Sequence, residues 1–255
     1  MCLHGMSYLP ILLVVLSTAT FISTYIIAIY KDDVSADFPY ISDTGTKPPE
    51  SCIFGQFLNI SAAICLCTVY VRYKLVESLS TTDDQMLRCL NKWGLALGII
   101  TSLGLSIVAN FQETLVEPVH IAGAGLVFGV GVVYAALQTR LTYYMHPDYN
   151  GLYIARIRLT LTLVSLVVMV LTFICAAISR RIPPKDKLHW KPDEPGYVEH
   201  IVSTVGEWIT AITFLLYFLT FVRDFTKIKI EVKSFVAVRH LDDPVYPNEQ
   251  TRLIA

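Results

Sequence analysis

Six apolar stretches, each long enough to cross a lipid bilayer, dominate this chain of 255 residues. A transmembrane helix needs about 20 mostly apolar residues, and a run of 18 or more with few charges predicts a span. Only 16% of the residues are charged, whereas a soluble domain carries about 25%. We therefore predict an all-α polytopic membrane protein with six transmembrane helices in one bundle, over residues 8–30, 52–71, 93–111, 119–137, 157–178 and 201–222.

The predicted spans belong to one transmembrane domain, residues 1–225, which is followed by a cytosolic tail, residues 226–255. The first span is longer than the apolar region of a signal peptide and has no basic residues before it, so we interpret it as a retained helix. In the segment that follows Val222, apolar and charged residues alternate. This alternation favours a short strand or an extended surface segment.

Positive charges favour an orientation with both termini in the cytosol. In that orientation 13 lysine and arginine residues lie on the cytosolic side and seven on the other side, as expected from the positive-inside rule. Five of those seven fall between residues 179 and 200, so this loop argues against the assignment. At the end of the second span, Tyr70, Arg72, Tyr73 and Lys74 predict an interfacial anchor whose basic groups reach lipid phosphates.

Polar side chains within or beside the spans form a candidate site near the non-cytosolic side, because charge at membrane depth is costly and usually faces protein or water. Glu207 lies about two turns inside the sixth span, with His200 on nearly the same helical face. A transporter or lipid-handling protein would use such a group, and a structural network between helices is the alternative. The predicted polar cluster consists of Asn59, Asn110, His120, His200 and Glu207.

The first loop contains Asp43-Thr44-Gly45, a tripeptide with which aspartic proteases place a catalytic carboxylate. Such an enzyme needs two carboxylates that share a proton, and the tripeptide occurs only once in the sequence. We interpret Asp43 and Gly45 as parts of an ordered luminal loop, in which Asp43 hydrogen-bonds the backbone near Gly45. An intramembrane hydrolase that uses Asp43 is the alternative.

The sequence contains no zinc pattern, no glycine loop for phosphate and no nucleophile elbow. We therefore expect a non-enzymatic protein without cofactor or metal, in contact with membrane lipids. A net charge of −1 gives no support for nucleic-acid binding.

The C-terminal residues fit an acidic-dileucine sorting signal, in which an acid precedes two aliphatic residues by four and five positions. Here these residues are Glu249, Leu253 and Ile254. Such a peptide binds as an extended segment whose apolar pair enters a pocket of its partner. We predict that clathrin-adaptor complexes bind the tail and direct the protein to endosomes and lysosomes.

Several short motifs resemble those of the damage-regulated autophagy modulator (DRAM) family, from the first span through the sixth. The tail is more similar to that of the second family member than to that of the first. The matching motifs are PYISDTGT at 39–46, PE at 49–50, IFG at 53–55, YVRYK at 70–74, IVANFQ at 107–112, KLHW at 187–190, GY at 196–197, EW at 207–208, FLT at 218–220 and RDF at 223–225.

The resemblance implies a six-span lysosomal membrane protein that promotes autophagy through the autophagy machinery, with the plasma membrane as a further location. It also implies a link to stress-induced cell death and, for the second member, to photoreceptor maintenance. The family supplies no catalytic or ligand-binding residues that could be transferred to this chain, so the polar cluster and the loop are predicted from the residues alone.

Overall fold

The computed structural model describes residues 5–80, 84–181, 184–229 and 231. The predicted sorting residues Glu249, Leu253 and Ile254 lie outside this part of the chain. Within it every regular element is helical, and six helical segments are long and apolar enough to cross a membrane. The predicted all-α, six-span fold is thus confirmed.

Six spans are formed by eight α-helices and one π-helix. The segments α4, η2 and α5 follow one another as a single span, Glu117–Tyr144, in which η2 is a π-helix. The bounds are α1 Tyr8–Tyr30, η1 Asp43–Gly45, α2 Glu50–Leu79, α3 Gln85–Asn110, α4 Glu117–Ala124, η2 Gly125–Val130, α5 Gly131–Tyr144, α6 Leu152–Ser179, α7 Tyr197–Leu219 and α8 Val222–Phe225.

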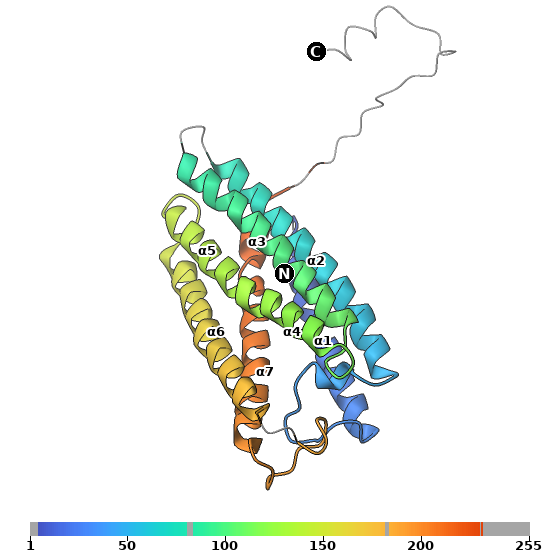
Figure 1. Ribbon diagram of the computed structural model, residues 1–255. Helices are drawn as coiled ribbons and strands as arrows, with labels where there is room; N and C mark the ends of the chain where they lie inside the picture. Colours follow the sequence, from blue (N-terminus) through green and yellow to red (C-terminus); the bar gives the residue numbers. More distant parts are fainter. Residues whose placement is uncertain (1–4, 81–83, 182–183, 230, 232–255) are drawn as a thin grey trace, which may run out of the picture.

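Consecutive spans pack side by side and close into a ring, because α7 returns to contact α1. The chain enters the ring at one end, which we call the terminal end; there α2 leads into α3, α5 leads into α6, and α8 follows α7. At the opposite end, which we call the loop end, residues 31–49, 111–116 and 180–196 connect the helices. Figure 1 shows the blue and orange loops of this end together at the bottom.

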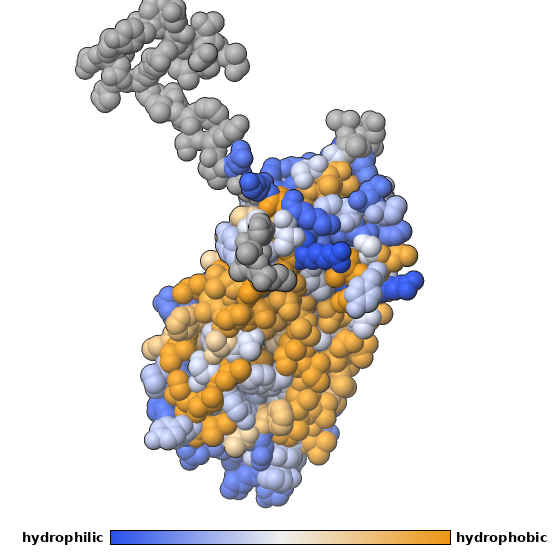
Figure 2. Space-filling model, turned by 180° about the vertical axis from the view of Figure 1, so that it is seen from behind, coloured by the Kyte–Doolittle hydropathy of each residue, from blue (hydrophilic) through white to orange (hydrophobic). Residues whose placement is uncertain are grey.

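A broad apolar band surrounds the bundle between two polar ends, as Figure 2 shows for one face. Many large apolar side chains of the spans are exposed, among them Val15, Leu103 and Val167. A soluble protein rarely exposes an apolar surface of this extent. The band therefore corresponds to the surface that lies in the hydrocarbon of the bilayer.

Helices α2, α3, α5 and α6 extend farther toward the terminal end than the predicted spans. The second helix ends at Leu79 instead of residue 71, and the third begins at Gln85 instead of residue 93. The start of α3 is fixed by a cap, since the Asp84 carboxylate accepts a hydrogen bond from the Leu87 amide at 3.0 Å. Hydropathy alone does not locate these ends, because caps and turns terminate a helix.

The segment after Val222 is the clearest correction to the sequence-based expectation. Residues Val222–Phe225 form the short helix α8 and are not a strand. Asp224 and Phe225 are 3% and 0% exposed, because both turn into the bundle. The alternation of charged and apolar residues there reflects a buried charge, not two faces of an exposed strand.

Candidate functional site

The first loop is packed over the loop end of the bundle. In η1 the Thr44 side chain is fully buried, and its Oγ1 lies 2.9 Å from Oγ1 of Thr24 on α1. Gly45 packs against the ring of Phe54 so closely that an added Cβ would lie 2.4 Å from it. The Gly45 amide donates to the Ser42 carbonyl at 3.1 Å, so the backbone closes this turn through Ser42 and not through the Asp43 carboxylate.

Asp43 presents a buried carboxyl group in this loop. The residue is 6% exposed, and burial raises the pKa of its carboxyl well above the ordinary value, with the neighbouring charges of Glu113 and Glu207 adding to the effect. The Tyr40 amide donates to the carboxylate and opposes the rise. Burial therefore favours the neutral form of the Asp43 carboxyl more than exposure to water would.

The predicted polar cluster is divided among separate places in the structure. Asn59 of α2 and Asn110 of α3 pair through their side-chain amides, with donor–acceptor distances of 3.0 Å in both directions. Ser106 also donates to Asn59 Oδ1 at 2.7 Å. These bonds join α2 to α3 and make Asn59 and Asn110 an interhelical contact.

Glu207 and His120 come together around shared cavities. Glu207 Oε2 accepts a hydrogen bond from the Ile41 amide at 2.7 Å, which ties α7 to the first loop. His120 Nδ1 lies 2.6 Å from the Phe111 carbonyl oxygen. Both side chains line a cavity of about 100 Å³ inside the ring and a second cavity of about 220 Å³ between α4 and α6.

His200 lies in a neighbouring aromatic setting. Its ring stacks on Trp190 at a centroid distance of 4.3 Å and meets Tyr40 edge-on at 5.2 Å. With Asp43 it lines a third cavity of about 270 Å³. This cavity shares the lining residues Tyr40, Glu113 and Arg180 with the second one, so Asp43, His120, His200 and Glu207 line neighbouring cavities at the loop end.

Ion pairs hold the rim of this region. Arg180 lies 2.6 Å from Glu113 and 3.5 Å from Glu117, and Lys187 lies 2.6 Å from Glu117. Ser42 also donates to Glu113 at 2.8 Å. Neither Asp43 nor Glu207 forms an ion pair with another described residue, so the two basic side chains neutralise the rim and not the interior.

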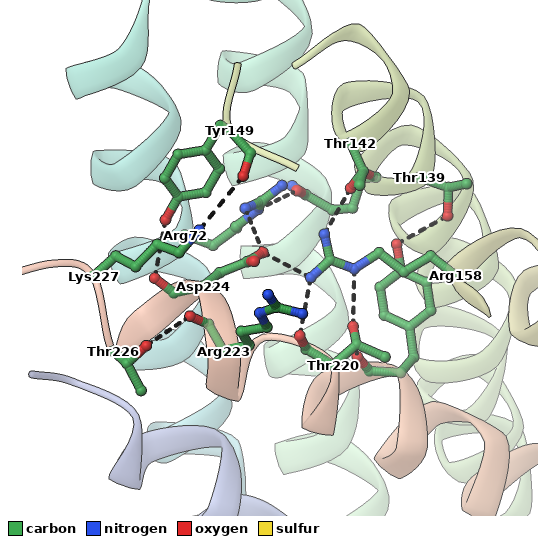
Figure 3. A network of polar contacts seen from close by, with 12 residues as sticks. Arg72, Thr139, Thr142, Tyr149, Arg158, Thr220, Arg223, Asp224, Thr226 and Lys227 are labelled. Carbon is green, nitrogen blue, oxygen red and sulfur yellow. Dashed lines mark hydrogen bonds and ion pairs between the residues drawn. The ribbon is translucent and has the colours of Figure 1, made fainter. Parts of the chain in front are cut away.

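The terminal end contains a buried network of charges that the sequence did not reveal (Figure 3). Asp224 Oδ2 accepts from Arg72 Nη1 at 3.0 Å and from Arg158 Nη2 at 2.7 Å. Both arginine side chains are 0% exposed and the aspartate side chain is 4% exposed. One carboxylate thus joins α2, α6 and α8.

Neutral partners extend this network, in which Arg72 Nη2 is buried without a hydrogen-bond partner among the described residues. Arg72 Nε donates to Gln138 at 3.1 Å, and Arg158 donates to Thr142 at 2.7 Å and to Thr220 at 2.9 Å. Both guanidinium groups also lie over the ring of Phe221, at 5.2 and 4.7 Å from its centroid. Hydrogen bonds and the aromatic face offset the cost of burying two cations against one anion.

The predicted membrane anchor at the end of the second span is therefore wrong for its central residue. Arg72 points into the bundle and does not reach lipid phosphates, while Tyr70 is 50% exposed. The sequence analysis missed this role because it assigned Arg72 and Arg158 to loops. Both residues lie within helices that continue past them, so their side chains occupy helical faces.

No cofactor site emerges from the described part of the chain. Its histidine, cysteine, aspartate and glutamate side chains form no group of three or more that could hold a metal ion. The neighbouring cavities of the loop end are the candidate site for a ligand.

Comparison with known proteins places the chain among related membrane proteins. The model of the Frag1/DRAM/Sfk1/Cwh43P N-terminal domain matches residues 5–228. DNA damage-regulated autophagy modulator protein 2 of Homo sapiens is 42% identical over 259 residues, covering 99% of this chain and 97% of the relative. No solved structure matches the chain.

Two further relatives carry similar names. DNA damage-regulated autophagy modulator protein 1 of Mus musculus is 41% identical, covering 91% of this chain and 96% of the relative. The modulator of macroautophagy TMEM150B-B of Xenopus laevis is 37% identical, covering 82% of this chain and 81% of the relative.

Proposed function

This chain belongs to the Frag1/DRAM/Sfk1/Cwh43P family, and from that premise we propose that it is a non-enzymatic membrane protein that modulates autophagy. The observation that carries the proposal is the similarity over 99% of the chain to a relative named as an autophagy modulator. The six-span bundle agrees with this role, since it provides a membrane-embedded scaffold.

We propose that the protein resides in the lysosomal membrane, with both termini in the cytosol and the loop end in the lumen. The excess of basic residues at the terminal end supports this orientation under the positive-inside rule. The buried carboxyl of Asp43 supports it too, because its raised pKa makes burial less costly in an acidic lumen.

We also propose that the tail is the sorting signal, with Glu249, Leu253 and Ile254 bound by clathrin adaptors. We propose a role in stress-induced cell death and in photoreceptor maintenance on the ground of the resemblance to the DRAM family. These proposals are independent of the proposed role in autophagy. If an experiment rejects them, the proposed role in autophagy still stands.

Measurement of autophagosome turnover tests the function. Cells that lack the protein should show slower turnover, and re-expression of the full chain should restore the normal rate. Equal turnover with and without the protein, under both fed and starved conditions, would contradict the proposed role in autophagy.

Imaging of a Leu253→Ala/Ile254→Ala variant tests the location separately. We expect the variant to leave lysosomes and accumulate at the cell surface, whereas an Asn248→Ala variant should stay in lysosomes. Lysosomal residence of the double variant at the normal level would show that another part of the chain carries the address.

A further inference from the structure

Residues 186–190 of the loop before α7, which we call the strap, lie beside the cavity of about 270 Å³ at the loop end. Lys187 and Trp190 both line this cavity. The Lys187 ammonium pairs with the carboxylate of Glu117 on α4 at 2.6 Å, and the Trp190 ring stacks on His200 of α7 at a centroid distance of 4.3 Å. The strap thus extends from α4 to α7 along one wall of the cavity.

Between these two residues the strap contacts the first loop through two polar contacts. The Ser35 amide donates a hydrogen bond to the Leu188 carbonyl at 2.8 Å. His189 Nε2 lies 3.1 Å from the Asp32 carbonyl oxygen. The first contact joins two backbone groups and does not titrate, whereas the second depends on the protons that the imidazole carries.

Both partners of the His189 ring are hydrogen-bond acceptors. Nδ1 lies 3.0 Å from Asp186 Oδ2, and the Asp32 carbonyl oxygen beside Nε2 can only accept. Hydrogen bonds, first from the Leu188 amide and then from His189, lower the pKa of the Asp186 carboxyl below its ordinary value, so this group is an anion at pH 5 and above. A neutral imidazole has one donor and satisfies one of these acceptors, whereas an imidazolium satisfies both.

The other charged groups of this junction have partners of their own. The charged side chains are Asp186 and Lys187 on the strap and Lys31, Asp32, Asp33 and Lys47 on the first loop. Lys31 and Lys47 both pair with Asp33, at 3.4 and 3.0 Å, and Lys47 also favours the ionised form of Asp186. Asp186 is therefore the charge that a proton on His189 neutralises, and histidine is the side chain that ordinarily changes its charge between pH 5 and 8.

We propose that acid closes the strap over this cavity: a proton on His189 joins the ring to Asp186 and to the first loop at once, and loss of the proton releases one of the two contacts. Access to the cavity thereby depends on pH. The effect is small, because the side chains of His189 and Asp186 are 32% and 57% exposed and exposed ion pairs are weak. The inference goes beyond the role in autophagy, and its test does not depend on the location of the protein.

Hydrogen exchange of the Ser35 amide tests the closure, because this amide bonds the strap. The full chain is measured in lipid nanodiscs at pH 5 and pH 7.5, with exchange times scaled for the intrinsic effect of pH on amide exchange. We expect about threefold more protection of Ser35 at pH 5, and we expect His189→Gln to remove this difference. His146→Gln, which replaces an exposed histidine at the terminal end, should keep it. Equal protection at the two pH values, or a difference that persists in a folded His189→Gln protein, would overturn the proposal.

Modification of a cysteine in the cavity wall tests whether the strap covers the cavity. Ser179 lines the cavity and is 2% exposed, so Ser179→Cys places a thiol there. At pH 5 a water-soluble methanethiosulfonate should modify this thiol about threefold faster when His189→Gln is also present, and at pH 7.5 the two rates should be equal. Comparison of the two proteins at one pH cancels the effect of pH on the thiol, and peptide mass spectrometry separates this position from the native cysteines. Equal rates at pH 5 would show that the strap does not cover the cavity and would reject the proposal.

Discussion

The two ends of the bundle use buried charge in opposite ways. At the terminal end, Asp224 is paired with two buried arginines, and these ion pairs join α2, α6 and α8. At the loop end, Asp43 and Glu207 line neighbouring cavities, and the basic residues nearby pair with Glu113 and Glu117 at the rim.

This contrast teaches which end stabilises the fold and which end is free to bind. A buried ion pair that also makes hydrogen bonds rigidifies the helices that it joins, and removal of one member is costly. A buried carboxyl without a cationic partner contributes little to stability, and it can still bind a proton or a ligand. The following predictions separate the two kinds of charge, beginning with the largest effect.

Replacement of Asp224 by Asn should produce the largest loss. The substitution leaves Arg72 and Arg158 buried with no counter-charge, and removal of one partner of a buried ion pair costs about 3–5 kcal/mol. We expect a markedly lower melting temperature in detergent micelles and a lower yield of folded protein. Asp148→Asn is the matched control, since Asp148 is exposed at the same end.

A combined variant sharpens this prediction. Replacement of the network by apolar residues, Arg72→Met/Arg158→Met/Asp224→Leu, should recover much of the stability that Asp224→Asn loses, because burial of charge itself has a cost. A melting temperature of Asp224→Asn close to that of the Asp148→Asn control would mean that the network does not stabilise the bundle, and the contrast between the two ends would fail.

The fold was predictable from the sequence because hydropathy is a local property. A window of about 20 residues suffices to recognise a span, and all six spans were found in this way. The network of the terminal end was not predictable by the same means, since Arg72 and Asp224 are 152 positions apart. Because the second span was predicted to end before its first charged residue, Arg72 was assigned to the membrane surface.

The candidate site was predictable in part, for a similar reason. The depth of a residue in a span follows from its position in the sequence, and His120, His200 and Glu207 lie toward the loop end of α4 and α7. Their rotation about the helix axis depends on packing, which one sequence does not contain. Asn59 and Asn110 therefore lie at the expected depth but bind each other between α2 and α3.

Asp43→Asn should change how stability depends on pH. An acid whose pKa is raised by folding stabilises the fold at low pH, and this contribution is lost as pH rises from its unfolded value, about 3.9, through the folded value. Because the pKa of Asp43 is raised by burial, its replacement by Asn should change the difference in melting temperature between pH 5 and pH 7.5 in favour of pH 7.5. The comparison of the variant with the unchanged protein at the two pH values isolates the contribution of this carboxyl.

Two groups on the same loop serve as comparisons for this pH effect. The pKa of Asp33 is lowered by its hydrogen bond with Lys47, so its contribution is lost only as pH falls below the usual aspartate range and does not compete between pH 5 and 7.5. Asp37 is exposed, and Asp37→Asn should leave the pH dependence unchanged. If Asp43→Asn also leaves it unchanged, the carboxyl is not held neutral by burial.

Arg180→Gln should have the smallest effect, although it removes two ion pairs from the loop end. Arg180 is 38% exposed, and exposed pairs contribute about 1 kcal/mol at most because water and salt screen them. We expect a melting temperature within a few degrees of the unchanged protein, and a smaller difference at high salt. A loss as large as that of Asp224→Asn would show that the rim is a structural lock too, and that both ends stabilise the bundle through charge.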